Sequence, residues 1–336
     1  MSTNLQYQVN EIHIEIEDAP VVKFPGDTDC NSPCWWSAGK FFILNSIGHP
    51  TRSAGESVEK MTRGAPITYT AWRDGGRWIE AVHADPDGTL YGWYHNEPAH
   101  YTLIPEEIQK GRQYRLTAPF IGALVSYDNG ENWDDLGLVL TGSPESMNIE
   151  SPNFWFAGGN GDFSVILDQK REYFYFLIGT YYKDVSQQGI SLARMRYADR
   201  GCPVGKVMKW RDGGWQAPGL NGKVSPVIPV RSSWYSPEPD TFWGPSVHWN
   251  SHIRQYVILL NRAIDPRWKQ EGIYISFTPD LTDPSSWSEP LKILDEKGWY
   301  PQVVGDPASQ GTDREAGEQA RLFIHGESKY FIRFSR

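Results

Sequence analysis

Residues 162–181, DFSVILDQKREYFYFLIGTY, decide the fold of this chain. The apolar run FSVIL is followed by the polar stretch DQKRE and then by a second run rich in aromatic and β-branched residues. Two such runs joined by a short polar turn are typical of a β-hairpin. The β-hairpin is therefore the expected building unit of the fold.

The same layout occurs four more times. The hairpins start near residues 31, 80, 162, 244 and 300, in NSPCWWSAGKFFILNS, EAVHADPDGTLYGWYHNEP, the stretch quoted above, GPSVHWNSHIRQYVILLNRA and WYPQVVG followed by ARLFIHGESKYFIRF. Repeats of this size, each with room for about four strands, are the pattern of a β-propeller. We therefore expect an all-β, five-bladed β-propeller that forms a single domain over residues 1–336.

Two other segments fit this architecture. EIHIEIED, about residues 11–18, alternates apolar and polar residues, and we expect this strand to complete the last blade because closing the ring removes the sheet edges. SYDNGENW, residues 126–133, has the S-x-D-x-G-x-x-W spacing of an Asp box. We expect its Asp and Gly to set a tight turn between outer strands and its Trp to pack between blades.

Composition excludes several classes of protein. Hydrophobic residues are 39% and charged residues 22% of the chain, which indicates a globular protein. The net charge of −9, without a run of Lys or Arg, argues against nucleic acid as a partner. No apolar stretch is long enough to cross a membrane. The oligomeric state is left open.

The N-terminus and the cysteines bear on where the protein works. MSTNLQYQVN lacks the basic head and apolar core of a signal peptide, so the protein is either cytoplasmic or secreted with a trimmed leader. The three cysteines, Cys30, Cys34 and Cys202, do not form a disulfide framework, and free thiols are favoured over a Cys30–Cys34 bridge.

A functional site is expected at one mouth of the axial channel. In a propeller, the first strand of each blade starts at the same face on which the second strand ends. The residues at these positions are Asp29, Asn31, Glu80, His83, His95, Glu97, Asp162, Tyr181, Trp243, His248, Arg262, Trp299, Tyr300 and His325. Paired carboxylates serve as the acid and the base or nucleophile of glycoside cleavage, while aromatic rings stack on sugars and polar groups bind hydroxyls. The set therefore predicts a glycoside hydrolase that acts on an oligo- or polysaccharide.

The segment at 162–181 resembles the third-blade motif of the five-bladed arabinanase and β-xylosidase family, and levanases, invertases and anhydrogalactosidases share that architecture. The resemblance implies that Asp162 tunes the pKa of the catalytic acid. The family places its base where this chain has Asn31, with Asp29 two residues earlier, and a Glu acid where this chain has Gly244.

The roles that follow are assigned with those departures in mind. Asp29 is expected to be the base or nucleophile, and Glu97 or Glu80 the acid. A histidine acid, as in the anhydrogalactosidase branch, makes His95, His83 and His248 further candidates. The substrate-binding residues are expected to be Asn31, His83, His95, Tyr181, Trp243, His248, Arg262, Trp299 and Tyr300.

Two other functions remain open from the sequence. A propeller that binds carbohydrate without cleaving it uses the same rings and carboxylates, and a protein-binding propeller uses an exposed apolar patch on its rim. No cofactor and no metal site are predicted. The axial channel is a place where propellers hold structural calcium, but no spacing of oxygen ligands indicates one here.

Overall fold

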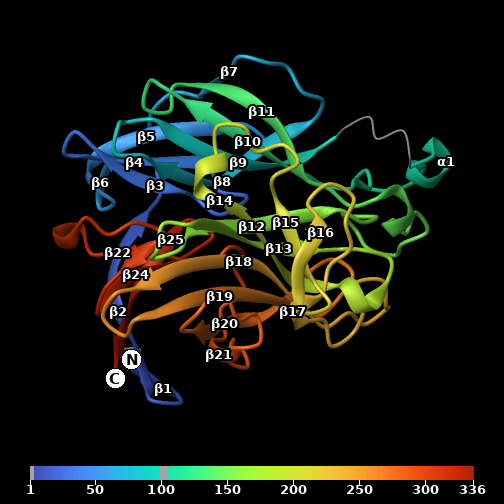
Figure 1. The fold of residues 1–336 in the computed structure, drawn as a ribbon. Coiled ribbons are helices and arrows are strands. Elements are labelled where there is room, and N and C mark those ends of the chain that lie inside the picture. The colour runs from blue at the N-terminus through green and yellow to red at the C-terminus, as the bar shows by residue number, and fades with distance from the viewer. Residues whose placement is uncertain (1–3, 99–103) are drawn as a thin grey trace.

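The computed structural model describes residues 4–98 and 104–336, which fold into five sheets arranged around a central axis (Figure 1). The innermost strands of blades 1 to 5 contact one another in sequence around the axis, from the first blade to the fifth. These strands are β3 (Cys34–Ser37), β8 (Gly76–Ala84), β12 (Asn160–Leu167), β18 (Thr241–Asn250) and β22 (Gln302–Gly305). The prediction of an all-β, five-bladed β-propeller is confirmed.

Each blade continues outward from its innermost strand. Blade 1 adds β4 (Lys40–Ser46), β5 (Pro50–Ser57) and β6 (Lys60–Thr62); blade 2 adds β9 (Leu90–Glu97), β10 (Phe120–Ser126), β11 (Asn132–Leu140) and β7 (Thr68–Tyr69). Blade 3 adds β13 (Tyr173–Thr180), β14 (Gly189–Arg196), β15 (Met208–Arg211) and β16 (Gly214–Pro218), with β17 (Pro226–Pro229) paired to β14. Blade 4 adds β19 (Gln255–Ala263), β20 (Gln270–Thr278) and β21 (Leu291–Leu294), with β23 (Glu315–Ala316) on its inner side.

Blade 5 is built from both ends of the chain. Outward from β22 it contains β24 (Gln319–Ile324), β25 (Glu327–Ser335), β2 (Ile12–Lys23) and β1 (Asn4–Val9). β2 pairs with β25 in antiparallel register, with Ile16 opposite Ile332, and both of these side chains are buried (Figure 1). The alternating N-terminal segment therefore lies in the last blade, beside the C-terminal strand.

Helical structure is minor. The described residues contain one short α-helix, α1 (Glu106–Gln109), and 3₁₀ turns at Pro144–Ser146, Val185–Gln187, Tyr197–Asp199 and Pro307–Ser309. Within residues 4–98 and 104–336, no helix has the length and apolarity needed to cross a bilayer. All three cysteines are unpaired, with Cys30 and Cys34 buried and Cys202 exposed.

The turn at residues 126–133 joins β10 to β11 and contacts the neighbouring blade. The Asp128 Oδ1 accepts the backbone N–H groups of Glu131 at 3.1 Å and Asn132 at 2.9 Å. Trp133 is buried among apolar residues of blades 1 and 2, and Asn129 accepts the indole N–H of Trp35 at 2.8 Å. Much of the aromatic content thus packs blade against blade.

Three of the innermost strands are interrupted by β-bulges at matching places. The register shifts between Ile79 and Ala81 in β8, between Gly161 and Phe163 in β12, and between Trp243 and Ser246 in β18. The bulges contain Glu80, Asp162 and Gly244, respectively, and the backbone φ is 45° at Asp162 and 59° at Gly244. A β-bulge redirects a side chain out of the regular alternation of a strand. The positions predicted as strand starts are therefore bulges inside the strands.

Candidate functional site

Glu80, His95 and Glu97 form a chain of charged groups in blade 2. The Glu80 Oε1 lies 2.5 Å from Nδ1 of His95, and the His95 Nε2 lies 3.6 Å from Oε1 of Glu97. The Glu80 Oε2 also accepts the backbone N–H of Phe163 at 3.2 Å. Glu80 and His95 are buried, whereas the side chain of Glu97 keeps 30% of its surface exposed.

The two buried members of this chain form an ion pair. Burial alone would lower the pKa of His95, but its contacts with Glu80 and Glu97 hold that pKa well above the ordinary value. Burial raises the pKa of Glu80, and His95 offsets part of the increase. Trp78 stacks on the His95 ring, with ring centroids 4.7 Å apart and planes 11° apart, which fixes the ring orientation.

Asp162 lies across the blade 2–blade 3 boundary from this pair. Its Oδ2 accepts the hydroxyl of Tyr181 at 2.6 Å, and both side chains are buried. Burial, followed by the negative charge of Glu80, raises the pKa of Asp162 to about 7. Asp162 is therefore a carboxyl group that carries a proton for part of the time at neutral pH.

Asp29 completes the group and lies closer to solvent. It is half-buried in the loop between β2 and β3, and its backbone N–H donates to the carbonyl of Ser46 at 2.8 Å. Burial raises the pKa of Asp29; the positive charge of His95 lowers it and the negative charge of Glu97 raises it. The exposed His325 also acts on Asp29. The Asp29 carboxyl therefore lies within electrostatic range of His95 and Glu97.

Tyr300 lies near the carboxyl groups on the blade 5 side. Burial, and then the charges of Asp162, Asp29 and Glu80, raise the pKa of its phenol well above the ordinary value. The four predicted catalytic residues thus lie together. Asp29 and Glu97 are partly exposed, whereas Glu80 and Asp162 are buried.

Asn31 holds the blades together at the axis. Its Nδ2 donates to the carbonyls of Phe163 at 2.9 Å and Pro245 at 2.8 Å, and its side chain is buried. One amide therefore links blades 1, 3 and 4. The prediction that Asn31 binds substrate is corrected, because both donors of the amide are already used inside the protein.

The aromatic residues chosen as sugar platforms mostly lie inside the protein. Trp243 is fully buried, and its indole N–H donates to Oε1 of Gln270 at 3.0 Å. Tyr181 and Tyr300 are buried as well, and only Trp299 is partly exposed. These rings are buried because they pack against one another. The ring centroid of Trp243 lies 5.0 Å from that of Trp299 and 5.5 Å from that of Tyr300. Trp299 alone keeps the expected accessibility.

The two strand histidines do not lie at this mouth, which corrects a further prediction. His83 is near the end of β8 and lines a cavity at the other end of the channel. His248 is fully buried beside Phe334 of blade 5, and neither ring nitrogen has a hydrogen-bond partner within the described part of the chain. Burial lowers the pKa of His248 to about 3, so the ring is neutral.

Arg262 is also occupied elsewhere. Its Nε and Nη2 each lie 2.6 Å from a carboxylate oxygen of Asp240, and its Nη1 donates to the hydroxyl of Tyr274 at 2.9 Å. This two-point ion pair uses the donors that a sugar hydroxyl would need. Arg262 is therefore corrected from a substrate-binding residue to a residue that stabilises blade 4.

Blade 4 offers no carboxylate at the matching bulge. A Cβ added to Gly244 would lie 3.5 Å from Oδ1 of Asn261 and 3.9 Å from the ring of Tyr300, so this position faces the same region as Asp162. One residue at the mouth, Trp78, was not chosen from the sequence, because a tryptophan two positions before Glu80 reads as a packing residue. His325, which the sequence placed at this mouth, lies in a hairpin turn with φ of 51°. Among the described residues, no cluster of three His, Cys, Asp or Glu side chains is arranged to hold a metal ion.

Comparisons with known proteins support the fold. No family model matches the chain, and no curated protein matches its sequence. The endo-arabinase of Bacteroides thetaiotaomicron is similar in structure, with a TM-score of 0.55, 10% identity, and coverage of 94% of this chain and 96% of that one. An exo-1,5-α-L-arabinanase from a bovine ruminal metagenomic library has a TM-score of 0.52, 10% identity and coverage of 92% of each chain.

A third similar structure is the exo-β-1,3-galactanase of Phanerochaete chrysosporium bound to galactose. Its TM-score is 0.50 at 10% identity, over 93% of this chain and 63% of that one. At such low identity, the likeness to all three structures shows a shared fold alone.

Proposed function

We propose that the protein is a glycoside hydrolase whose reaction takes place at the mouth formed by blades 1, 2, 3 and 5. The observation that carries the proposal is the grouping of Asp29, Glu80, Glu97 and Asp162 around His95. Cleavage of a glycosidic bond needs two carboxyl groups, one to protonate the leaving oxygen and one to act as base or nucleophile. The fold shared with arabinanases and a galactanase agrees with this chemistry.

The solvent accessibility of the four carboxyl groups indicates which two can reach a substrate. A group that exchanges a proton with substrate must come within hydrogen-bond reach of it. Glu97 and Asp29 have exposed surface, whereas the side chain of Glu80 is enclosed and bonded to His95 and Phe163. Asp29 and Glu97 are therefore the proposed catalytic residues, and Glu80 is a positioning residue that fixes His95.

Charge suggests the role of each. The raised pKa of Asp29 lets it keep a proton to higher pH than a solvated aspartate, which suits a general acid. The Glu97 Oε1 lies 3.6 Å from Nε2 of His95, a contact that orients the carboxyl group and suits a base or nucleophile. This order is the reverse of the one expected from the sequence, in which Asp29 is the base or nucleophile and Glu97 or Glu80 the acid. Asp162 is buried, and its protonation changes the net charge of the site without contact with the substrate.

The leaving group of the substrate distinguishes the two orders. Loss of a general acid is tolerated when the leaving group needs no protonation, whereas loss of the base or nucleophile is not. We expect Asp29→Asn to retain activity on a dinitrophenyl glycoside and to lose it on a nitrophenyl or natural glycoside. Glu97→Gln is expected to lose both. The opposite result assigns Asp29 as the base.

The activity itself is tested with a panel of chromogenic α-L-arabinofuranosides and β-D-galactosides, together with arabinan and β-1,3-galactan. Asp27→Asn is the matched control, because this exposed aspartate lies two residues from Asp29. Turnover by the wild type and by Asp27→Asn, but not by Asp29→Asn, supports the proposal. Turnover that survives in both Asp29→Asn and Glu97→Gln overturns the proposed pair.

A second candidate function rests on Gly244. Blades 2 and 3 place carboxyl groups at their inner bulges, and blade 4 has glycine at the corresponding bulge. A propeller that binds carbohydrate without cleaving it needs no third carboxylate. This reading predicts that oligosaccharides bind to the wild type and remain intact.

A further inference from the structure

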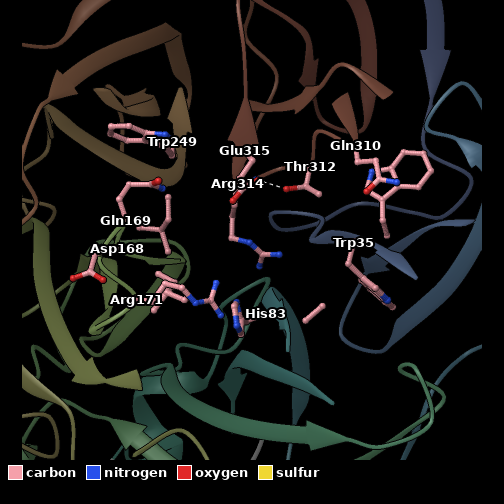
Figure 2. A pocket seen from close by; sticks show the side chains of 14 residues that line it. Trp35, His83, Asp168, Gln169, Arg171, Trp249, Gln310, Thr312, Arg314 and Glu315 are labelled. Atoms are coloured by element: carbon pink, nitrogen blue, oxygen red, sulfur yellow. Dashed lines mark hydrogen bonds between the residues drawn. The ribbon is translucent and has the colours of Figure 1, made fainter. Parts of the chain in front are cut away.

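A second cavity lies at the other end of the axial channel, where the innermost strands end (Figure 2). Its volume is about 360 Å³. Each of the five blades contributes a side chain to its wall, namely Trp35, His83, Arg171, Trp249 and Arg314 in blade order. Arg171 lies in the turn between β12 and β13, and Arg314 lies between β22 and β23. The cavity is therefore a feature of the whole ring.

Two guanidinium groups point into this cavity. Figure 2 shows Arg171 and Arg314 directed toward each other and toward His83. The Nη1 of Arg314 is shielded from solvent and has no acceptor in residues 4–98 or 104–336. Its Nη2 has only long contacts, 3.4 Å to the carbonyl of Cys34 and 3.9 Å to the carboxylate of Asp313.

Arg171 is the second guanidinium at this cavity. Among the described residues, no carboxylate oxygen comes within 4.0 Å of its guanidinium, which lies 5.4 Å over the ring of Tyr197. Arg314 is half-buried and has a shielded nitrogen without an acceptor in the described part of the chain, which is unfavourable unless an anion compensates it. Arg171 is exposed and keeps its hydration. Two guanidinium groups directed at one space favour the binding of an anion between them.

The acidic residues at the cavity wall do not supply that anion. The Asp168 Oδ1 already accepts the backbone N–H groups of Glu172 at 2.7 Å and Tyr173 at 3.3 Å. Glu315 is an exposed residue at the rim. Asp85, behind His83, is paired with Arg200 at 2.6 Å. Asp313 accepts the backbone N–H of Cys34 at 2.9 Å and reaches Arg314 only at 3.9 Å. The other carboxylates near the cavity are engaged elsewhere or open to solvent.

The positive charges of Arg171 and Arg314 act on the imidazole of His83. The pKa of this residue is lowered to about 4 by burial, with Arg314 and Arg171 adding to the effect and Asp85 opposing it. The ring is therefore neutral at pH 7, with Nε2 3.0 Å from Oδ1 of Asp85. The positive charge that faces the cavity comes from Arg171 and Arg314.

The rest of the wall fits the body of a sugar. Trp249 is partly exposed and provides ring surface on one side. Trp35 is buried, with its indole N–H bonded to Asn129, and only closes the wall on the opposite side. Gln169 and Gln310 provide amide groups for hydroxyls. We propose that this cavity binds a carboxylate-bearing sugar, such as a hexuronate at the end of a glycan, with the carboxylate between Arg171 and Arg314. The proposal does not depend on catalysis at the opposite mouth.

Calorimetric titration of the full chain with D-glucuronate and D-galacturonate tests the proposal, with D-glucose and sodium phosphate as comparison ligands. We expect at least one uronate to bind at least about tenfold more tightly than glucose, because an ion pair with two guanidiniums is lost in the neutral sugar. Binding of glucose to the same extent, or of phosphate more tightly than either uronate, overturns the proposal.

Variants locate the binding. Arg171→Gln and Arg314→Gln are each expected to weaken uronate binding at least about tenfold, and Arg211→Gln, a surface arginine of β15, is expected to leave it unchanged. Arg171 lies in an exposed turn, so its variant carries the test if Arg314→Gln does not fold. Asp29→Asn and Glu97→Gln should still bind the uronate, which separates this cavity from the opposite mouth. Uronate binding that is unaffected by Arg171→Gln, or lost in Asp29→Asn, contradicts the proposed site.

Discussion

The carboxylate Oε1 of Glu80 and the imidazole Nδ1 of His95 lie 2.5 Å apart between two strands of blade 2, with both side chains buried. The Phe163 backbone N–H bonds the other oxygen of Glu80, so the pair also joins blade 2 to blade 3. An ion pair in this position fixes the ring that Glu97 contacts. Its integrity therefore matters to both stability and the site.

Breaking this pair from one side should be costly. We expect Glu80→Gln to lower the free energy of unfolding by about 3–5 kcal/mol, because it leaves His95 buried without its counter-charge. Urea unfolding at pH 7 measures the change. The exposed pair of Glu56 and Lys60, 3.1 Å apart, provides the control, and Glu56→Gln should change stability by less than about 1 kcal/mol. Equal effects of the two variants would show that the buried pair is not structural.

Asp162 should make stability depend on pH. Its folded pKa of about 7 lies above the unfolded value near 3.8, so the folded state binds more protons between these pH values. Its contribution to stability is complete below pH 3.8 and is lost as the pH rises through 7. Relative to Asp162→Asn, the wild type should therefore become less stable from pH 4 to pH 7, with a constant difference at higher pH. A difference that does not change over this range contradicts the raised pKa.

The Tyr181 hydroxyl should influence the pKa of Asp162. Its hydrogen bond at 2.6 Å stabilises the carboxylate form, so Tyr181→Phe is expected to raise the pKa of Asp162 further. The pH dependence of unfolding, measured as for Asp162→Asn, should shift upward in this variant. Phe176→Leu is a matched control in the same blade, since Phe176 is buried on β13 but packs between blades 2 and 3. A similar upward shift in both variants would trace the effect to loosened packing.

The turn at 126–133 should matter to stability and not to activity. Asp128→Ala removes an acceptor of two backbone N–H groups, and we expect a loss of about 1–2 kcal/mol in unfolding free energy. Glu131→Gln, in the same turn, serves as the control. Because the turn packs against Trp35, away from Asp29 and Glu97, kcat on any glycoside that is turned over should remain within about twofold of the wild type. A selective loss of kcat would place this turn in the site.

The sequence predicted the architecture because the inner hairpins repeat strongly. Five apolar hairpins with polar turns are enough to indicate five blades. The aromatic residues that pack between blades make the apolar pattern of each hairpin easier to recognise in the sequence. The bulges at Glu80 and Asp162 were not visible, since a bulge changes register without changing the order of apolar and polar residues. The predicted strand starts were therefore displaced into the strands.

The site was only partly predictable for a related reason. Alternation along a strand tells which residues share a face, but in a propeller both faces of an inner strand pack against neighbouring blades. His248 accordingly faces blade 5 instead of the channel. In the sequence, Arg262 has no recognisable partner, and only the folded structure shows its ion pair with Asp240. The carboxylates were found because the first strand of a blade starts at the face where the second strand ends, and this holds whatever the exact register.

Hydrolysis of a glycoside by the purified full chain tests the central claim most directly. The account predicts that the wild type releases free sugar from at least one substrate of the arabinoside and galactoside panel. Glu97→Gln should reduce kcat by a factor of about 10² or more, and Asp27→Asn should leave it unchanged. A wild type that binds oligosaccharides of the panel yet cleaves none of them, or a Glu97→Gln variant with full kcat, contradicts the account.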